Sequence, residues 1–84
     1  MKQSVEVDFC KNLFFISSRS QILDLLNDSN LNDKERDFVK SRYISGLSVK
    51  EMCEVYHLDE GAYKKMHRRI LAKFYLYIKV NKIA

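Results

Sequence analysis

The chain has 84 residues and a mass of 10.0 kDa, which suffices for a single domain over residues 1–84 but leaves little room for an enzyme cleft. Apolar residues make up 46% of it, so the composition excludes a disordered chain. The net charge of +4 is uneven: residues 1–39 hold five basic and seven acidic side chains, and residues 40–84 hold ten basic and four acidic. This positive C-terminal part favours a polyanionic partner, most commonly nucleic acid.

No apolar run approaches the roughly eighteen residues that a membrane span requires, and the first residues carry charges where a secretory signal would be apolar. We therefore expect a cytoplasmic protein without a membrane partner. Neither Cys10 and Cys53 nor His57 and His67 have partners at metal-ligand spacing. The sequence predicts free, buried thiols, a turn role for His57, a core role for His67, and no metal or cofactor.

Helices are the expected elements, because proline is absent and glycine occurs only twice. We predict an all-α domain of four or five helices. A first helix spans residues 4–17, with an apolar stripe formed by Val5, Phe9, Leu13 and Ile16. A second spans residues 20–28, with Ile22, Leu23, Leu25 and Leu26 on one broad stripe. Ser18 and Gln21 have capping-box spacing that would separate the two, although the segment could also form one continuous helix.

Two further helices are indicated by their first residues. Asn32 precedes two acidic residues, a pattern typical of a helix start, and Gly46 lies where a left-handed residue would end that helix. Ser48 and Glu51 repeat the capping-box spacing and predict a short helix. Its inner face is expected to consist of Met52, Val55 and Tyr56.

A long basic helix is predicted to start after Asp59, which has the character of an N-cap. Its buried side is expected to comprise Tyr63, Met66, His67, Ile70, Leu71, Phe74, Tyr75 and Ile78. A short helix, a turn of about three residues and a long basic helix together form a helix-turn-helix, in which the long helix is the recognition helix. We assign residues 31–74 to this core, residues 1–30 to N-terminal helical segments and residues 75–84 to a C-terminal extension.

Four sub-motifs follow one another without gaps in residues 31–74. They read Leu-Asn-Asp-Lys-Glu-Arg from Leu31, Gly-Leu-Ser-Val-Lys-Glu-Met from Gly46, Leu-Asp-Glu-Gly-Ala-Tyr-Lys from Leu58, and Ile70 followed by Lys73 and Phe74. The series resembles the DNA-binding domain of LuxR-type regulators and its structural relative, region 4 of bacterial sigma factors. The chain departs from that pattern at the turn glycine, here His57, and at the cap serine, here Asp59. The resemblance implies a helix-turn-helix transcription regulator.

The helical period divides the basic helix into a buried side and an outward side. The outward side, expected to face DNA, carries Glu60, Gly61, Lys64, Lys65 and Arg68. Its lysines and arginine are suited to guanine edges or phosphates, and Gly61 permits close backbone approach. Further phosphate contacts are expected from Arg69 and Lys73, which flank this side, and from Ser48 and Lys50 at the start of the short helix. The alternative is a solvated basic face.

The function these observations favour is sequence-specific double-stranded DNA binding by a non-enzymatic transcription regulator. The capping box accounts for Ser48 and Glu51, so no catalytic triad with His57 is needed. An alternative is a protein-interaction module, resembling sigma region 4, that docks on RNA polymerase or a partner regulator. The C-terminal helix also carries apolar groups around much of its circumference, namely Leu71, Phe74, Tyr75, Leu76, Tyr77, Ile78 and Val80. They predict a homodimer through this helix, unless the N-terminal segments cover them.

Overall fold

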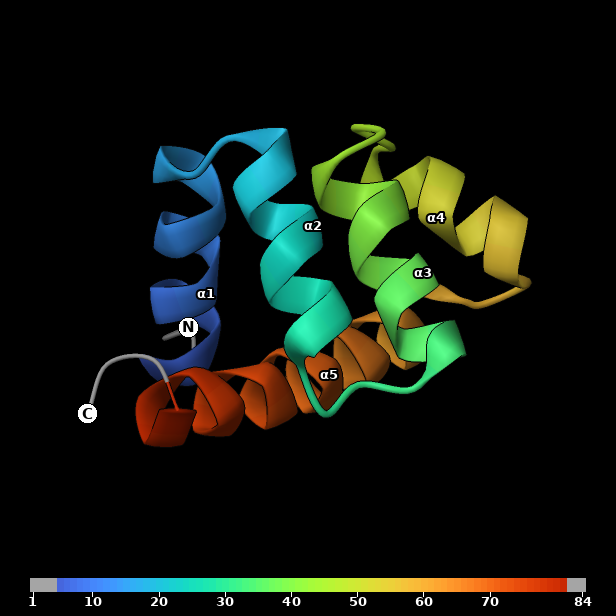
Figure 1. Ribbon diagram of the computed structural model, residues 1–84. Coiled ribbons are helices and arrows are strands. Elements are labelled where there is room, and N and C mark those ends of the chain that lie inside the picture. Colours follow the sequence, from blue (N-terminus) through green and yellow to red (C-terminus); the bar gives the residue numbers. More distant parts are fainter. Residues whose placement is uncertain (1–4, 82–84) are drawn as a thin grey trace.

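Five α-helices follow one another in the computed structural model, which describes residues 5–81 (Figure 1). They are α1 (Val5–Ile16), α2 (Arg19–Asp28), α3 (Asp33–Tyr43), α4 (Val49–Tyr56) and α5 (Glu60–Asn81). The described residues contain no strand, so the predicted all-α class is confirmed. None of these helices combines the length and the apolar character that crossing a membrane takes.

Three helices begin with a capping box, in which a polar cap side chain and the side chain three residues later each bond the other's backbone N–H. The pairs are Ser18 with Gln21, Asn32 with Glu35, and Ser48 with Glu51. The sequence spacing predicts the boxes at Ser18 and Ser48, and it predicts Asn32 as a helix start. The box at Ser18 shows that α1 and α2 are two helices and not one, because its extended cap residue interrupts the helical backbone.

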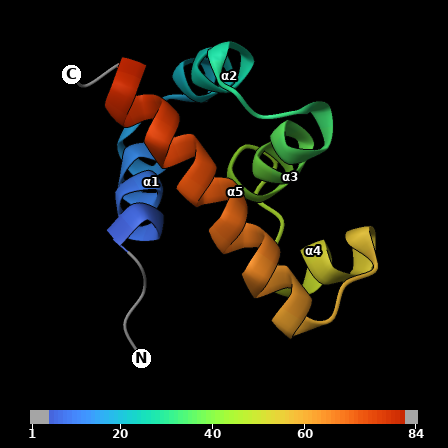
Figure 2. The same cartoon turned by 90° about the horizontal axis from the view of Figure 1, so that it is seen from below.

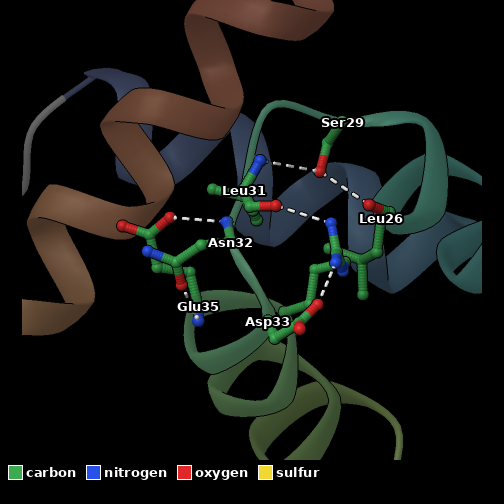
Figure 3. A network of polar contacts seen from close by, with 7 residues as sticks. Leu26, Ser29, Leu31, Asn32, Asp33 and Glu35 are labelled. Carbon is green, nitrogen blue, oxygen red and sulfur yellow. Dashed lines mark hydrogen bonds and ion pairs between the residues drawn. The ribbon is translucent and has the colours of Figure 1, made fainter.

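The connection between α2 and α3 is held by a short chain of hydrogen bonds (Figure 3). The Ser29 hydroxyl donates to the Leu26 carbonyl at 2.7 Å and accepts from the Leu31 N–H at 3.3 Å. The capping box of Asn32 and Glu35 follows immediately. The last carbonyls of α2 and the first N–H groups of α3 are therefore satisfied locally, which fixes where α3 starts.

Helix α5 passes below α1, α2 and α3 in Figure 1, and in Figure 2 it runs diagonally with α1 on one side and α2, α3 and α4 on the other. Its 22 residues span about 33 Å, so a single helix can contact both ends of the molecule. Helix α4 packs beside its first half, and α1 makes the most extensive contact with it. Every helix contributes to one buried cluster, which consists of Val7, Cys10, Phe14, Ile22, Leu26, Leu31, Phe38, Val39, Met52, Tyr63, Ile70, Leu71, Phe74 and Ile78.

The predicted stripe of α1 is partly wrong: Phe9 and Leu13 pack partly buried against the core, but the other two residues do not. Val5 and Ile16 are exposed, and the buried residues are Val7, Cys10 and Phe14, on the other side of the helix. Eight of the twelve residues of α1 are apolar and they surround its axis, so its periodicity fits more than one register. Contact with α5 selects the register: the Cys10 thiol donates to the Leu71 carbonyl at 3.3 Å, and the Phe14 ring stacks on Phe74 at 5.6 Å.

The predicted inner face of α4 is partly wrong, because Val55 is exposed. Met52 is fully buried, and the partly buried Tyr56 packs its ring 5.5 Å from that of Phe38. The Tyr56 hydroxyl also lies 3.1 Å from the Ser41 hydroxyl. Val49 and Cys53 also pack partly buried against the core, whereas Val55 stays in solvent. Among the thiols, both predicted to be free, Cys10 is buried, whereas Cys53 is only partly buried.

Candidate nucleic-acid interface

The candidate interface is built on α4, the three residues 57–59, and the first half of α5. Helix α4 ends at His57, whose φ of 56° and ψ of 47° place it in the left-handed region. The next N–H, that of Leu58, donates to the Cys53 carbonyl at 2.9 Å. Asp59 then accepts the Ala62 N–H at 2.7 Å, as an N-cap does. His57 therefore has the left-handed backbone conformation that glycine adopts most readily, and the turn has the predicted length.

The first half of α5 presents a basic surface to solvent. Its exposed residues include Gly61, Lys64, Lys65, Arg68 and Arg69. They lie on the side of α5 that faces away from the core, because Tyr63, Ile70 and Phe74 are buried on the opposite side. We call these five residues the basic face. In Figure 2 the view from below looks onto α5 with the rest of the fold behind it.

Glu60 begins α5 next to the basic face. Its carboxylate lies 3.9 Å from the Lys64 ammonium, and both side chains are exposed. An exposed pair of this kind contributes little to stability, about 0.3–0.5 kcal/mol at helical i,i+4 spacing. The carboxylate also lies at the positive end of the helix dipole. Glu60 therefore has a structural role in the free protein, and Lys64 is only loosely held.

Lys73 is engaged with α3. Its ammonium donates to the Glu35 carboxylate at 2.9 Å, and the Glu35 side chain is only 13% exposed. Burial of Glu35 opposes its ionisation, but the Asn32 N–H and the Lys73 ammonium hold its pKa below the usual range. The charge of Arg69 acts in the same direction. Lys73 was predicted as a phosphate ligand; in the free protein it anchors α5 to the start of α3.

The N–H groups at the start of α4 are also engaged, here by a capping box within the chain. Ser48 accepts from the Glu51 N–H at 3.1 Å, and the Glu51 carboxylate accepts from the Ser48 N–H at 2.8 Å. These hydrogen bonds hold the pKa of Glu51 below its usual range. A carboxylate therefore already lies where a phosphate would approach the helix N-terminus. The neighbouring Lys50 is exposed. Of the two phosphate candidates on α4, Lys50 is thus the more accessible.

His67 lies on the inner side of α5, behind the basic face, and packs against Tyr43 and Tyr63. Its Nε2 atom lies 2.7 Å from the Tyr43 hydroxyl, and its ring stacks on Tyr63 with centroids 5.5 Å apart. Burial, with the charges of Lys11 and Arg42 adding to it, lowers the pKa of His67 to about 4. His67 is therefore neutral at pH 7 and has the core position that the sequence predicts. Among residues 5–81 no cluster of side chains suited to a metal ion occurs.

Sequence reasoning missed two of these features. The bond from Tyr43 to His67 joins residues 24 positions apart, and Lys11 and Arg42, whose charges act on His67, lie 31 positions apart. Such pairs leave no local spacing signal, because they meet only when α1, α3 and α5 pack. Comparison with known proteins found no matching family model, no similar curated protein and no similar solved structure. The likeness to LuxR-type regulators and sigma region 4 thus stays a prediction from the four sub-motifs.

Proposed function

We propose that the protein is a transcription regulator that binds double-stranded DNA sequence-specifically, with the first half of α5 in the major groove. The observation that carries this proposal is the basic face on a long helix that follows a short helix and a three-residue turn. The short helix braces the long one, and a major groove about 12 Å wide admits the long one. We also propose a cytoplasmic location, because such a regulator must be in the same compartment as the DNA that it binds.

Within the basic face, the residues differ in their proposed roles. Lys65 and Arg68 are central on the outward side and are proposed to contact base edges, with Arg68 suited to the O6 and N7 atoms of guanine. Lys64 and Arg69 are proposed to contact phosphates, joined by Lys50 on α4. Contacts of the second kind orient the protein without reading sequence. Lys73 is the least available of the predicted residues because of its ion pair with Glu35.

A triple variant tests the basic face: Lys64→Ala, Lys65→Ala and Arg68→Ala. The matched control removes three exposed cations elsewhere, with Arg19→Ala, Lys34→Ala and Lys79→Ala, and so changes the net charge equally. DNA fragments selected from a random pool by the wild type serve as the probe in a gel-shift assay. We expect the first triple to abolish binding and the control to weaken it only slightly. Equal losses in both would mean that only bulk charge matters and would contradict the proposal.

Two single changes sharpen this test. Arg68→Ala should weaken binding by about 1–3 kcal/mol if it contacts a guanine, and should relax specificity at that base pair. Gly61→Ala is a cleaner probe, because an added Cβ would meet only the Asp59 carboxylate at 3.5 Å, an ordinary contact. The free fold should therefore tolerate it. Weakened DNA binding by a normally folded Gly61→Ala variant would indicate close backbone approach to the duplex.

The alternative function is docking on RNA polymerase or a partner regulator. It shares the fold, and the outward side of α4 favours it, since the exposed Val55 lies next to the exposed Glu54. Interface cores are depleted of charged residues, so Val55 and not Glu54 is the candidate contact. Retention of polymerase in a pull-down after nuclease treatment would support docking. Loss of a DNA gel shift with rising salt, at a log-log slope of about −0.9 per phosphate contact, would support direct binding.

We also propose a homodimer through the second half of α5. Leu76 is 60% exposed and Val80 is 69% exposed, and the two lie one helical turn apart. Phe9 of α1 covers the neighbouring Tyr75, with ring centroids 5.2 Å apart, but Leu76 and Val80 stay outside that contact. A dimer would bury both, and helix-turn-helix dimers bind half-sites about 34–36 Å apart, one turn of DNA.

A further inference from the structure

A hollow of about 540 Å³ opens between α1 and the end of α3, lined by none of the residues of the basic face. Its lining consists of Lys11, Asn12, Phe14, Phe15, Arg42 and Tyr43. This volume is within the range of sites that take small molecules. Its lining holds two cations and three aromatic rings and no acidic side chain. This composition favours a ligand that is both anionic and aromatic.

Arg42 carries one of the two positive charges that line this hollow. One guanidinium nitrogen, Nη1, donates to the Leu47 carbonyl at 3.1 Å, and the guanidinium lies over the Tyr43 ring with its Cζ 5.4 Å from the centroid. The Nε atom is buried and has no hydrogen-bond partner among residues 5–81. No carboxylate of those residues lies within ion-pair distance of Arg42. A buried donor without an acceptor is unfavourable, so an acceptor that reaches Nε through a small shift of the Arg42 side chain would be stabilising.

The charge of Lys11 reaches the same place from α1. After burial, the charges of Lys11 and then Arg42 are the causes that lower the pKa of His67, which hydrogen-bonds Tyr43. The two cations come from different helices, and both line the hollow. An anion bound between them would interact favourably with both, and Arg side chains suit carboxylates and phosphates because of their planar fork of donors.

Phe15 offers an aromatic surface beside the two cations. It is 88% exposed, so it contributes nothing to the core, although the adjacent Phe14 is buried against Tyr43 with centroids 4.6 Å apart. An aromatic ring at the edge of a basic hollow offers a flat face for another planar ring to stack on. The amide of Asn12 lies in the same lining and both donates and accepts hydrogen bonds.

We propose that this hollow binds a small ligand that joins an oxyanion to a planar aromatic ring, such as a nucleoside monophosphate. The oxyanion lies between Arg42 and Lys11, and the ring stacks on Phe15. This site is separate from the basic face, so it can be tested without DNA. Failure of the test would leave the proposed DNA binding untouched, and the reverse also holds.

The test is a titration of the ¹⁵N-labelled protein with adenosine 5′-monophosphate, followed by amide chemical shifts. We expect saturable shifts in residues 11–15 and 42–43, and affinities at least about tenfold lower for adenosine alone and for inorganic phosphate alone. The Phe15→Ser variant should bind at least about tenfold more weakly than the wild type. Its matched control is Ile16→Ser, because Ile16 is also exposed and apolar but does not line the hollow. Arg42→Met should abolish binding, and its circular dichroism spectrum checks that it is folded.

Several results would overturn the proposal. They are shifts that do not saturate, shifts confined to the basic face, and equal weakening by Phe15→Ser and Ile16→Ser. A short DNA duplex that moves the signals of residues 11–15 when the mononucleotide does not would also overturn it, since the hollow would then be part of a nucleic-acid surface. Loss of binding in Phe15→Ser with retention in Ile16→Ser supports the site even if Arg42→Met fails to fold.

Discussion

The Tyr43 hydroxyl lies 2.7 Å from Nε2 of His67, and this hydrogen bond joins the last residue of α3 to the first half of α5. The Tyr43 ring also packs on Phe14 of α1. Three helices therefore meet at one polar contact inside an aromatic cluster. Burial raises the pKa of Tyr43 to about 12 and lowers that of His67 to about 4, so both groups are neutral at pH 7. A neutral pair avoids an uncompensated buried charge behind the basic face.

We predict that the protein loses stability in mild acid because of His67. Its pKa of about 4 in the fold is below the ordinary value of 6.5, so the unfolded chain binds the proton more readily. The stabilisation is complete above the unfolded pKa and is lost as the pH falls towards the folded pKa. From about pH 7.5 to about pH 5.5 the free energy of unfolding should fall by about 1 kcal/mol, allowing for the partial exposure of the ring. Urea unfolding at the two pH values measures this.

The His67→Gln variant is the control for this prediction. Glutamine does not titrate, and its amide can still bond the Tyr43 hydroxyl. Its free energy of unfolding should change much less between the two pH values than that of the wild type. An unchanged pH dependence in His67→Gln would assign the effect to other groups.

Neighbouring phenylalanines in α1 test the register of that helix. Phe14 is buried between Tyr43 and Phe74, so Phe14→Ala should lower the free energy of unfolding by about 3 kcal/mol. Phe15 is exposed, and Phe15→Ala should change it by less than about 0.5 kcal/mol. Urea unfolding of both variants gives the comparison. Similar losses in the two would mean that α1 packs in another register.

The helix starts were predictable because they depend on neighbouring residues. Ser18, Asn32 and Ser48 each find their capping partner three positions later, and that spacing is visible in the sequence. The register of α1 was not, because apolar residues surround that helix and only packing decides which of them are buried. The same holds for Val55, because only packing decides which residues at the edge of α4 stay exposed.

The candidate site was predictable to the extent that it lies on one helix. Helical periodicity places Lys64, Lys65 and Arg68 outwards, and all three are exposed. It says nothing about a partner from another helix, so it could not indicate that Glu35 engages Lys73. For the same reason the hollow beside Arg42 has no signature in the sequence.

The turn before α5 gives a second stability prediction. His57 has a positive φ of 56°, a conformation that is unfavourable for any residue with a Cβ. We expect His57→Gly to raise the free energy of unfolding by up to about 1 kcal/mol, since glycine relieves that strain. Gly46 is a glycine that already has a positive φ, of 80°, and an added Cβ there would have no atom within 4 Å. There Gly46→Ala should lower stability by about 1 kcal/mol through the backbone alone. A destabilised His57→Gly would indicate that the imidazole makes a compensating contact.

The proposed homodimer gives the last prediction. At micromolar concentrations, sedimentation equilibrium should give a mass of about twice the 10.0 kDa of one chain. Leu76→Glu should reduce it to that of a monomer, because a charge buried in the interface without a partner is unfavourable. Val55→Glu is the matched control: Val55 is also exposed but lies on α4, and its change should leave the dimer intact. The Leu76→Glu monomer should also bind a two-half-site DNA more weakly than the wild type while binding a single half-site equally well. A wild-type mass of 10.0 kDa over the whole range would show that Leu76 and Val80 remain in solvent, and the dimer would then be wrong.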